Sequence, residues 1–192
     1  MPSARPLAVF MQTSLDGYFC DLGGDMSFAH KPLDDTEWHA FVTANASSES
    51  TLVFGRRTYE LMANWWPTPA AVQAMPDVAG RMNASPKLVF SRTLNETHWP
   101  NTTLVKGELV TTIGRMKREP GAPLVVLGSG SIVTQLVDAG LVDTVQLVVN
   151  PVALGNGHSF LAGLQRPLNL SLTRSRTFTN GSVVLWYRVQ TS

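Results

Sequence analysis

The sequence predicts an α/β fold with one mixed, mostly parallel sheet and helices on both of its faces. Short apolar runs typical of buried strands alternate with segments whose apolar residues recur at helical spacing. This alternation is typical of parallel β-α-β units. Near the carboxyl end, two strand-like segments flank Asn180-Gly181, a strong hairpin signal that adds an antiparallel strand at the sheet edge.

The expected strands are short apolar runs bounded by turn residues. Pro151 limits the strand that ends at Val149, because proline cannot donate a hydrogen bond within a sheet. In chain order the strands are Leu7–Met11, Thr51–Phe54, Lys87–Phe90, Thr102–Lys106, Leu124–Leu127, Thr144–Val149, Leu168–Phe178 and Ser182–Val189.

The expected helices lie between these strands, and residues 18–33 are expected to form an irregular loop. The first helix begins at Asp34 or Asp35, where Glu37 has the spacing of a capping box with Asp34. The second covers Arg57–Trp65 and is stopped by the prolines that follow. Two more helices are marked by apolar stripes at Leu109, Ile113 and Met116, and at Ile132, Val133, Leu136 and Val137, the latter ending near Gly140.

Composition favours one domain over residues 1–192, because 44% of the residues are hydrophobic and no linker-like stretch divides the chain. A net charge of +1 offers no general attraction for nucleic acid or an anionic membrane. The single cysteine, Cys20, excludes an intrachain disulfide and a four-thiolate zinc site. The histidines lack metal-ligand spacing, so we predict no metal site.

Targeting signals are also not expected. Residues 1–11 carry no apolar stretch long enough for a signal peptide, and no run approaches the roughly 18 apolar residues of a membrane helix. We therefore expect a cytoplasmic protein that acts on a small molecule.

The first candidate site is Gly55-Arg56-Arg57-Thr58, at the end of an expected strand and the start of a helix. A helix amino terminus presents free N–H groups to a phosphate, and guanidinium groups pair with phosphate bidentately. The alternative is a tight turn at Gly55 with both arginines solvated.

The second candidate is Gly128-Ser129-Gly130-Ser131-Ile132, again between a strand and a helix. Its glycines allow a backbone to approach a pyrophosphate, although the third glycine of the Rossmann fingerprint is absent. An ordinary glycine-rich turn is the alternative.

The third candidate, Ser91-Arg92, also ends a strand, but by itself it favours a simply exposed arginine over a contact with a ribose phosphate. Together the three motifs place two helix amino termini and three arginines along one sheet edge. This combination favours a dinucleotide with an additional phosphate, and NADPH in preference to NADH.

Two carboxylates are candidates for the substrate side. Asp16 follows the first strand and could orient a substrate or assist protonation during hydride transfer, although an Asx-type turn with Gly17 is a serious alternative. Asp34 and Asp35 are expected to cap a helix, and one of them could also face the cleft.

The motifs resemble those of the dihydrofolate-reductase-like superfamily, which has a three-layer α/β fold. The similarity is closer to the reductase domain of bifunctional riboflavin-biosynthesis deaminase-reductases and their stand-alone bacterial relatives. It covers nearly the whole chain and rests on the ordered set Ser14-Leu15-Asp16-Gly17, Gly55–Glu60, Gly128-Ser129-Gly130, Gly140-Leu141-Val142-Asp143 and Asn150–Gly157.

The resemblance implies an NADPH-dependent oxidoreductase. Because relatives often form homodimers, it also implies a homodimer. It assigns the 2′-phosphate and pyrophosphate to Arg56, Arg57 and Thr58, and the adenosine end to Ser91 and Arg92. It further assigns the pyrophosphate to Gly128–Ile132 and the substrate side to Asp16. Asp35 could correspond to the acidic residue of folate reductases, but its neighbours do not secure this match.

Three functions therefore stay open. The first is reduction of a small heterocycle of the 5-amino-6-(5-phosphoribosylamino)uracil type. The second is reduction of dihydrofolate or another pterin. The third is nucleotide binding without catalysis. The glycine sequence Gly-Ser-Gly is poorer in glycine than that of folate reductases and places folate second, and the zinc-dependent deaminase half is absent.

Overall fold

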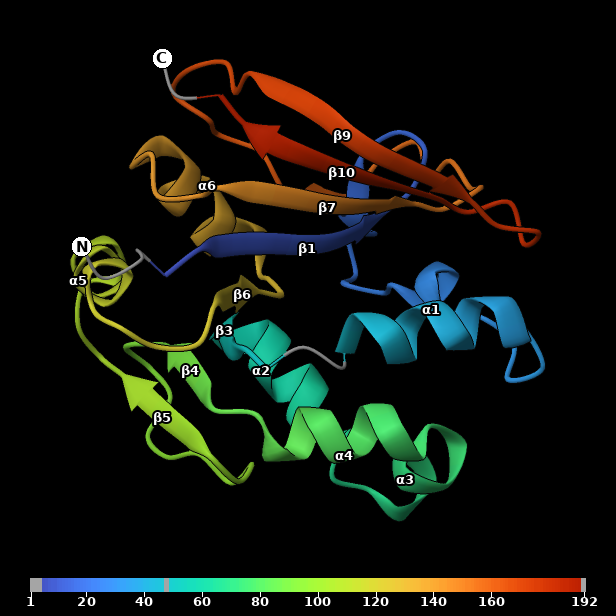
Figure 1. The fold of residues 1–192 in the computed structure, drawn as a ribbon, viewed down its shortest axis with the longest axis horizontal. Coiled ribbons are helices and arrows are strands. Elements are labelled where there is room, and N and C mark those ends of the chain that lie inside the picture. Colours follow the sequence, from blue (N-terminus) through green and yellow to red (C-terminus); the bar gives the residue numbers. More distant parts are fainter. Residues whose placement is uncertain (1–4, 47–48, 191–192) are drawn as a thin grey trace.

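A computed structural model describes residues 5–46 and 49–190. Its main feature is an eight-stranded sheet in the order β5-β4-β3-β6-β1-β7-β10-β9 (Figure 1). Neighbouring strands are parallel from β5 to β7, whereas β10 runs antiparallel to both β7 and β9. The strands are β1 (Leu7–Thr13), β3 (Thr51–Gly55), β4 (Lys87–Phe90), β5 (Thr102–Val105), β6 (Leu124–Val126), β7 (Thr144–Val149), β9 (Leu170–Thr177) and β10 (Val183–Val189).

Helices cover both faces of this sheet, so the molecule has three layers. The helices are α1 (Thr36–Ala46), α2 (Arg56–Ala63), α3 (Pro69–Ala74), α4 (Pro76–Ala84), α5 (Leu109–Arg118) and α6 (Gly130–Asp138). No helix in the described parts of the chain combines the length and the apolar character needed to cross a membrane.

One face of the sheet is closed by α5 and α6. Val9 and Val126 point to this side and pack with Ile113 of α5 and Val133 and Leu136 of α6 in one continuous cluster. All five side chains are fully buried. Burying a side chain of this kind stabilises the fold by about 1.5–3 kcal/mol, so this layer is the structural base of the molecule.

The opposite face carries two separate clusters. Trp38 and Phe41 of α1 pack on Val148 and Val184, over the β7–β10 end of the sheet. At the other end, Tyr59 of α2 belongs to a cluster with residues of β3, β4 and the loop before β5. Because the two clusters do not meet, the middle of this sheet face remains open.

A second, two-stranded sheet consists of β2 (Tyr18–Cys20) and β8 (His158–Ser159), paired in antiparallel fashion. A short 3₁₀ turn at Ser27–Ala29 follows β2. We call the β2–β8 pair the small sheet. It follows from this arrangement that residues 18–33, expected as an irregular loop, contain a strand that pairs with a distant segment.

Most expected elements are confirmed, with ends that differ by a few residues, but α3 and α4 were not expected. Pro69 does not merely stop the preceding helix, because it occupies the first turn of α3, where proline is well tolerated. The side chain of Thr68 caps this helix by accepting a hydrogen bond from the backbone N–H of Ala71.

The expected capping box between Asp34 and Glu37 is wrong. Asp35 caps α1 by accepting from the backbone N–H of Trp38 at 3.0 Å. Glu37 instead accepts hydrogen bonds from Arg176 and Thr179, because the β9–β10 hairpin lies within its reach. A long-range partner therefore competes successfully with the local motif.

Candidate active-site cleft

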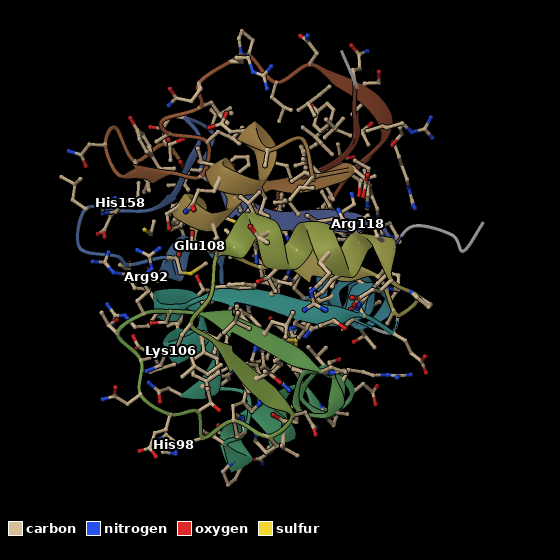
Figure 2. All side chains as sticks on the ribbon, turned by 90° about the vertical axis from the view of Figure 1, so that its left-hand side faces the viewer. Arg92, His98, Lys106, Glu108, Arg118 and His158 are labelled. Carbon is tan, nitrogen blue, oxygen red and sulfur yellow. The ribbon has the colours of Figure 1, made fainter. Side chains whose placement is uncertain are left out.

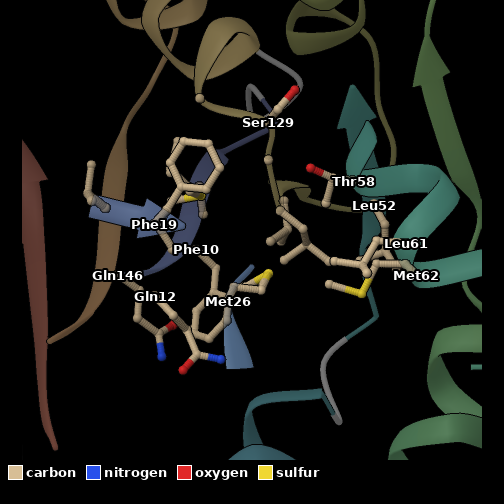
Figure 3. A pocket seen from close by; sticks show the side chains of 18 of the residues that line it. Phe10, Gln12, Phe19, Met26, Leu52, Thr58, Leu61, Met62, Ser129 and Gln146 are labelled. Carbon is tan, nitrogen blue, oxygen red and sulfur yellow. The ribbon is translucent and has the colours of Figure 1, made fainter. Parts of the chain in front are cut away.

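A cleft of about 1140 Å³ lies over the open middle of the sheet. Ala8, Phe10 and Gln12 of β1 line its floor, together with Leu127 after β6 and Gln146 of β7. Figure 3 shows Phe10, Phe19 and Met26 on one side of the cleft and Leu52, Leu61 and Met62 on the other. The walls are therefore largely apolar, as in a site that holds a flat ring.

Two of the predicted phosphate motifs meet at one end of this cleft. Strands β3 and β6 are neighbours, and the backbone N–H of Gly55 donates to the carbonyl oxygen of Gly128 at 2.8 Å. We call Gly128–Ser131 the glycine loop. The peptide bond between Gly128 and Ser129 is cis.

Close packing explains why glycine occupies these positions. A Cβ atom on Gly55 would lie 2.5 Å from Ser129 Oγ, and one on Gly128 would lie 2.8 Å from Thr58 Oγ1. A Cβ on Gly130 would lie 3.0 Å from the Cα of Phe160. The glycine loop is thus wedged between α2 and the segment around β8.

The first turns of α2 and α6 begin at this junction. Among the described residues, no side chain caps either helix with a hydrogen bond. Their first N–H groups and the positive ends of their dipoles are therefore left to a ligand or to solvent. Two such helix ends side by side suit an extended anion such as a pyrophosphate.

The adjacent arginines face opposite sides of α2. Arg57 and Thr58 line the cleft together with the glycine loop. Arg56 lines a second hollow of about 870 Å³, with Thr93 and Leu94. It also forms an exposed ion pair with Glu60 at 3.1 Å.

The third motif lies on the neighbouring strand. Gly55 pairs in register with Phe90, so Ser91 follows β4 beside the start of α2. Ser91 Oγ accepts from the backbone N–H of Leu94, and the exposed Arg92 pairs with Glu108 at 2.7 Å. Figure 2 shows Arg92 next to Glu108. Neither Ser91 nor Arg92 lines the cleft, and neither does Gly55 or Ile132.

Asp16 connects two loops. Its carboxylate accepts hydrogen bonds from the Ser14 hydroxyl at 2.6 Å and from the backbone N–H groups of Leu154 and Gly155. These bonds, the Ser14 hydroxyl first, lower the pKa of Asp16 to about 2, although the residue is exposed. Asp16 is outside the set of residues that line the cleft, and its contacts position the chain that leads to β8.

Asp35 is held in a similar way at the start of α1. Beyond its cap to Trp38, it accepts from the side-chain amide of Asn180 at 2.7 Å. The Trp38 N–H and then this amide lower the pKa of Asp35. Asp35 lies outside the cleft lining as well, so the geometry assigns it a capping contact between α1 and the hairpin.

Several cleft residues were not expected from the sequence. Gln12, Asn45 and Gln146 line the cleft with neutral amides, and Gln146 Nε2 donates to Asn45 Oδ1 at 3.0 Å. The alternation of Phe10 and Gln12 with buried Val9 and Met11 was a usable signal, because alternate strand residues share a face.

The charge of the cleft is basic. Arg57 and Arg81 are the charged side chains among the described residues that line it. This charge favours an anionic ligand. In the described part of the chain, no three His, Cys, Asp or Glu side chains are grouped so as to hold a metal ion.

Comparison with known proteins identifies the family. Residues 5–184 match the model of the RibD C-terminal domain. The chain belongs to this family. An uncharacterised protein, YyaP of Bacillus subtilis (strain 168), is 27% identical over 183 residues, which cover 95% of this chain and 94% of that protein.

Solved structures share the fold. A protein from Shewanella sp. PV-4, named for riboflavin biosynthesis, has a TM-score of 0.73 at 22% identity and covers 97% of this chain and 99% of its own. A pyrimidine reductase-like protein from Corynebacterium diphtheriae has a TM-score of 0.63 at 13% identity, covering 98% and 93%. Dihydrofolate reductase from Enterococcus faecalis, complexed with NADP(H), has a TM-score of 0.64 at 14% identity, covering 97% of each chain. The fold is therefore that of dihydrofolate reductase.

Proposed function

We propose that this RibD C-terminal domain protein is an NADPH-dependent reductase of a small heterocycle, of the 5-amino-6-(5-phosphoribosylamino)uracil type. One observation carries the proposal: two uncapped helix amino termini meet the glycine loop at the end of an apolar cleft. Such a junction suits the pyrophosphate of a dinucleotide, and the cleft leaves room for two rings beside it.

The residues present fit NADPH. The glycine loop and Thr58 would hold the pyrophosphate, because they lie against each other and line the same cleft: a Cβ on Gly128 would meet Thr58 Oγ1 at 2.8 Å. Arg57 would add its charge from the cleft side. Arg56 lies on the other side of α2, in the hollow beside the turn formed by Ser91 and Arg92, and would face the adenosine end and its 2′-phosphate.

When bound, NADPH supplies a hydride to an acceptor ring. The contribution of the chain is to align the two rings and to exclude water from them. Phe10 and Phe19 offer flat apolar surfaces in the cleft, opposite Leu61 and Met62 (Figure 3). Met side chains adapt to ligand shape, which suits a wall that closes on a ring.

The two arginines provide the test. Arg56→Ala should weaken NADPH binding about tenfold to hundredfold and leave NADH nearly unchanged, because only NADPH has the 2′-phosphate. Arg57→Ala should weaken both cofactors to a similar extent, since both contain a pyrophosphate. Titration calorimetry of the purified protein with each cofactor measures these affinities.

Arg115→Ala is a matched control, because Arg115 of α5 forms an exposed i,i+4 ion pair with Glu119, the residue that follows this helix, as Arg56 does with Glu60 on α2. It should change neither affinity. Absence of binding by both cofactors would overturn the proposal. Binding without oxidation of NADPH by any heterocycle in a screen would favour a non-catalytic nucleotide-binding protein.

A further inference from the structure

Gln12 occupies a distinctive position in the cleft. It is the last residue of β1 that lines the cleft, and Gln146 on the neighbouring strand lines the same cleft, paired in register with Phe10 (Figure 3). Its Oε1 atom is buried and has no hydrogen-bond partner among the described residues.

An unpaired buried amide oxygen is uncommon, because desolvating it without a donor costs about 1–3 kcal/mol. The terminal torsion of glutamine is broad, so the amide can turn toward a bound ligand at little cost. Once turned, it offers one acceptor and one donor side by side. The complementary ligand edge is an N–H next to a carbonyl.

The surroundings of Gln12 also favour a neutral ring. The other amide side chains among the described residues of the cleft, Gln146 and Asn45, are bonded to each other. The charged residues of the cleft, Arg57 and Arg81, are cations. A protonated, amidinium-like ring would meet no compensating charge here, and it requires a carboxylate for a paired contact.

We propose that Gln12 is a specificity-determining residue that recognises a neutral lactam edge, an N–H beside a C=O, on the substrate ring. This inference rests on the proposed reductase function and adds to it a residue that selects among heterocycles. Gln12 would favour the binding of lactam rings over rings of the 2,4-diaminopyrimidine type, which present an amidine edge.

The test uses two probes, 5,6-diaminouracil and 2,4-diaminopyrimidine, the second at a pH at which its ring is protonated. Each is titrated calorimetrically into the NADPH-loaded protein. The wild-type protein should bind the uracil at least tenfold more tightly. Gln12→Glu should reverse this preference, because a carboxylate accepts two hydrogen bonds from an amidinium edge and repels a carbonyl oxygen.

Gln12→Leu should lose about tenfold in affinity for the uracil without gaining affinity for the diaminopyrimidine, and it keeps the inference testable if the glutamate variant does not fold. Gln73→Glu makes the same charge change on the exposed side of α3 and should leave both affinities unaltered. Unchanged selectivity in Gln12→Glu or Gln12→Leu would overturn the inference.

NADPH affinity, measured in the same variants, separates the two hypotheses. If the variants bind NADPH normally and their ring selectivity is unaltered, the role of Gln12 is rejected and the reductase function is not. If the wild-type protein itself does not bind NADPH, the reductase function is rejected.

Discussion

At the scale of single residues, Asp16 was a candidate for contact with the substrate, and in the structure its hydrogen bonds hold two loops together. Its two carboxylate oxygens hold Ser14 on one side and Leu154 and Gly155 on the other. The chain after Gly155 leads directly to Gly157 and to β8, which line the cleft. A direct contact of Asp16 with substrate stays a prediction.

The low pKa of Asp16 predicts a pH-dependent contribution to stability. A carboxyl whose folded pKa lies near 2, below its usual 3.8, stabilises the fold fully above the higher value. The contribution is lost as the pH falls toward the lower value. Asp16→Asn should therefore reduce stability at neutral pH, and the gap to wild type should narrow between those two pH values. Urea unfolding at a series of pH values measures it, and a gap that is independent of pH would contradict the assignment.

At the scale of elements, the site depends on how the glycine loop packs against β8. A Cβ on Gly130 would lie 3.0 Å from the Cα of Phe160 and 3.2 Å from the carbonyl oxygen of Ser159. Both are backbone atoms, so they cannot move aside as the end of a flexible side chain does.

Gly130→Ala should consequently displace the glycine loop from the small sheet. We expect a loss of about 1–3 kcal/mol in stability and about a tenfold loss in NADPH affinity. Thermal unfolding and calorimetry measure the two effects. Gly80→Ala is the matched control: nothing lies within 4 Å of its Cβ, and it should stabilise α4 by about 0.5–1 kcal/mol. Equal behaviour of the two variants would contradict the packing role of Gly130.

At the scale of the whole molecule, the candidate ligand site lies where the helices do not cover the sheet. Helices α5 and α6 close one face, whereas α1 and the α2–α4 group leave the middle of the other face open. A dinucleotide at the glycine loop would contact α2, α6 and the segment around β8 together. Its binding should therefore stabilise the native state as a unit.

NADPH at about 100 times its dissociation constant should add about 2.7 kcal/mol to the stability of the fold. For a chain of this size that corresponds to a rise in melting temperature of about 5–10 °C. Differential scanning calorimetry with and without NADPH measures the shift. The Arg57→Ala variant should show a smaller rise at the same NADPH concentration, and an equal rise would argue against cofactor contact by Arg57.

Local signals predicted much of this architecture. The strands of the main sheet between Leu7 and Val149 and the hairpin at Asn180-Gly181 were predicted because burial and turn chemistry leave direct marks in a sequence. The small sheet was missed because its strands are only three and two residues long and pair across more than a hundred positions. The role of Glu37 was missed because its partners lie in the distant β9–β10 hairpin. Thr68-Pro69 was a usable local signal for the start of α3, because threonine is favoured at the N-cap and proline in the first turn.

The sequence by itself determined the fold class and marked the segments that are candidates for phosphate binding, because hydrophobic period, glycine and charge act locally. Only the tertiary structure decided which of these segments lie together and which side of α2 each arginine faces. It joined Gly55–Thr58 to the glycine loop, turned Arg56 and Arg57 to opposite sides of α2, and placed Gln12 at the cleft floor. The physical reason is register: strand order and pairing decide which distant residues become neighbours, and no local pattern contains that order.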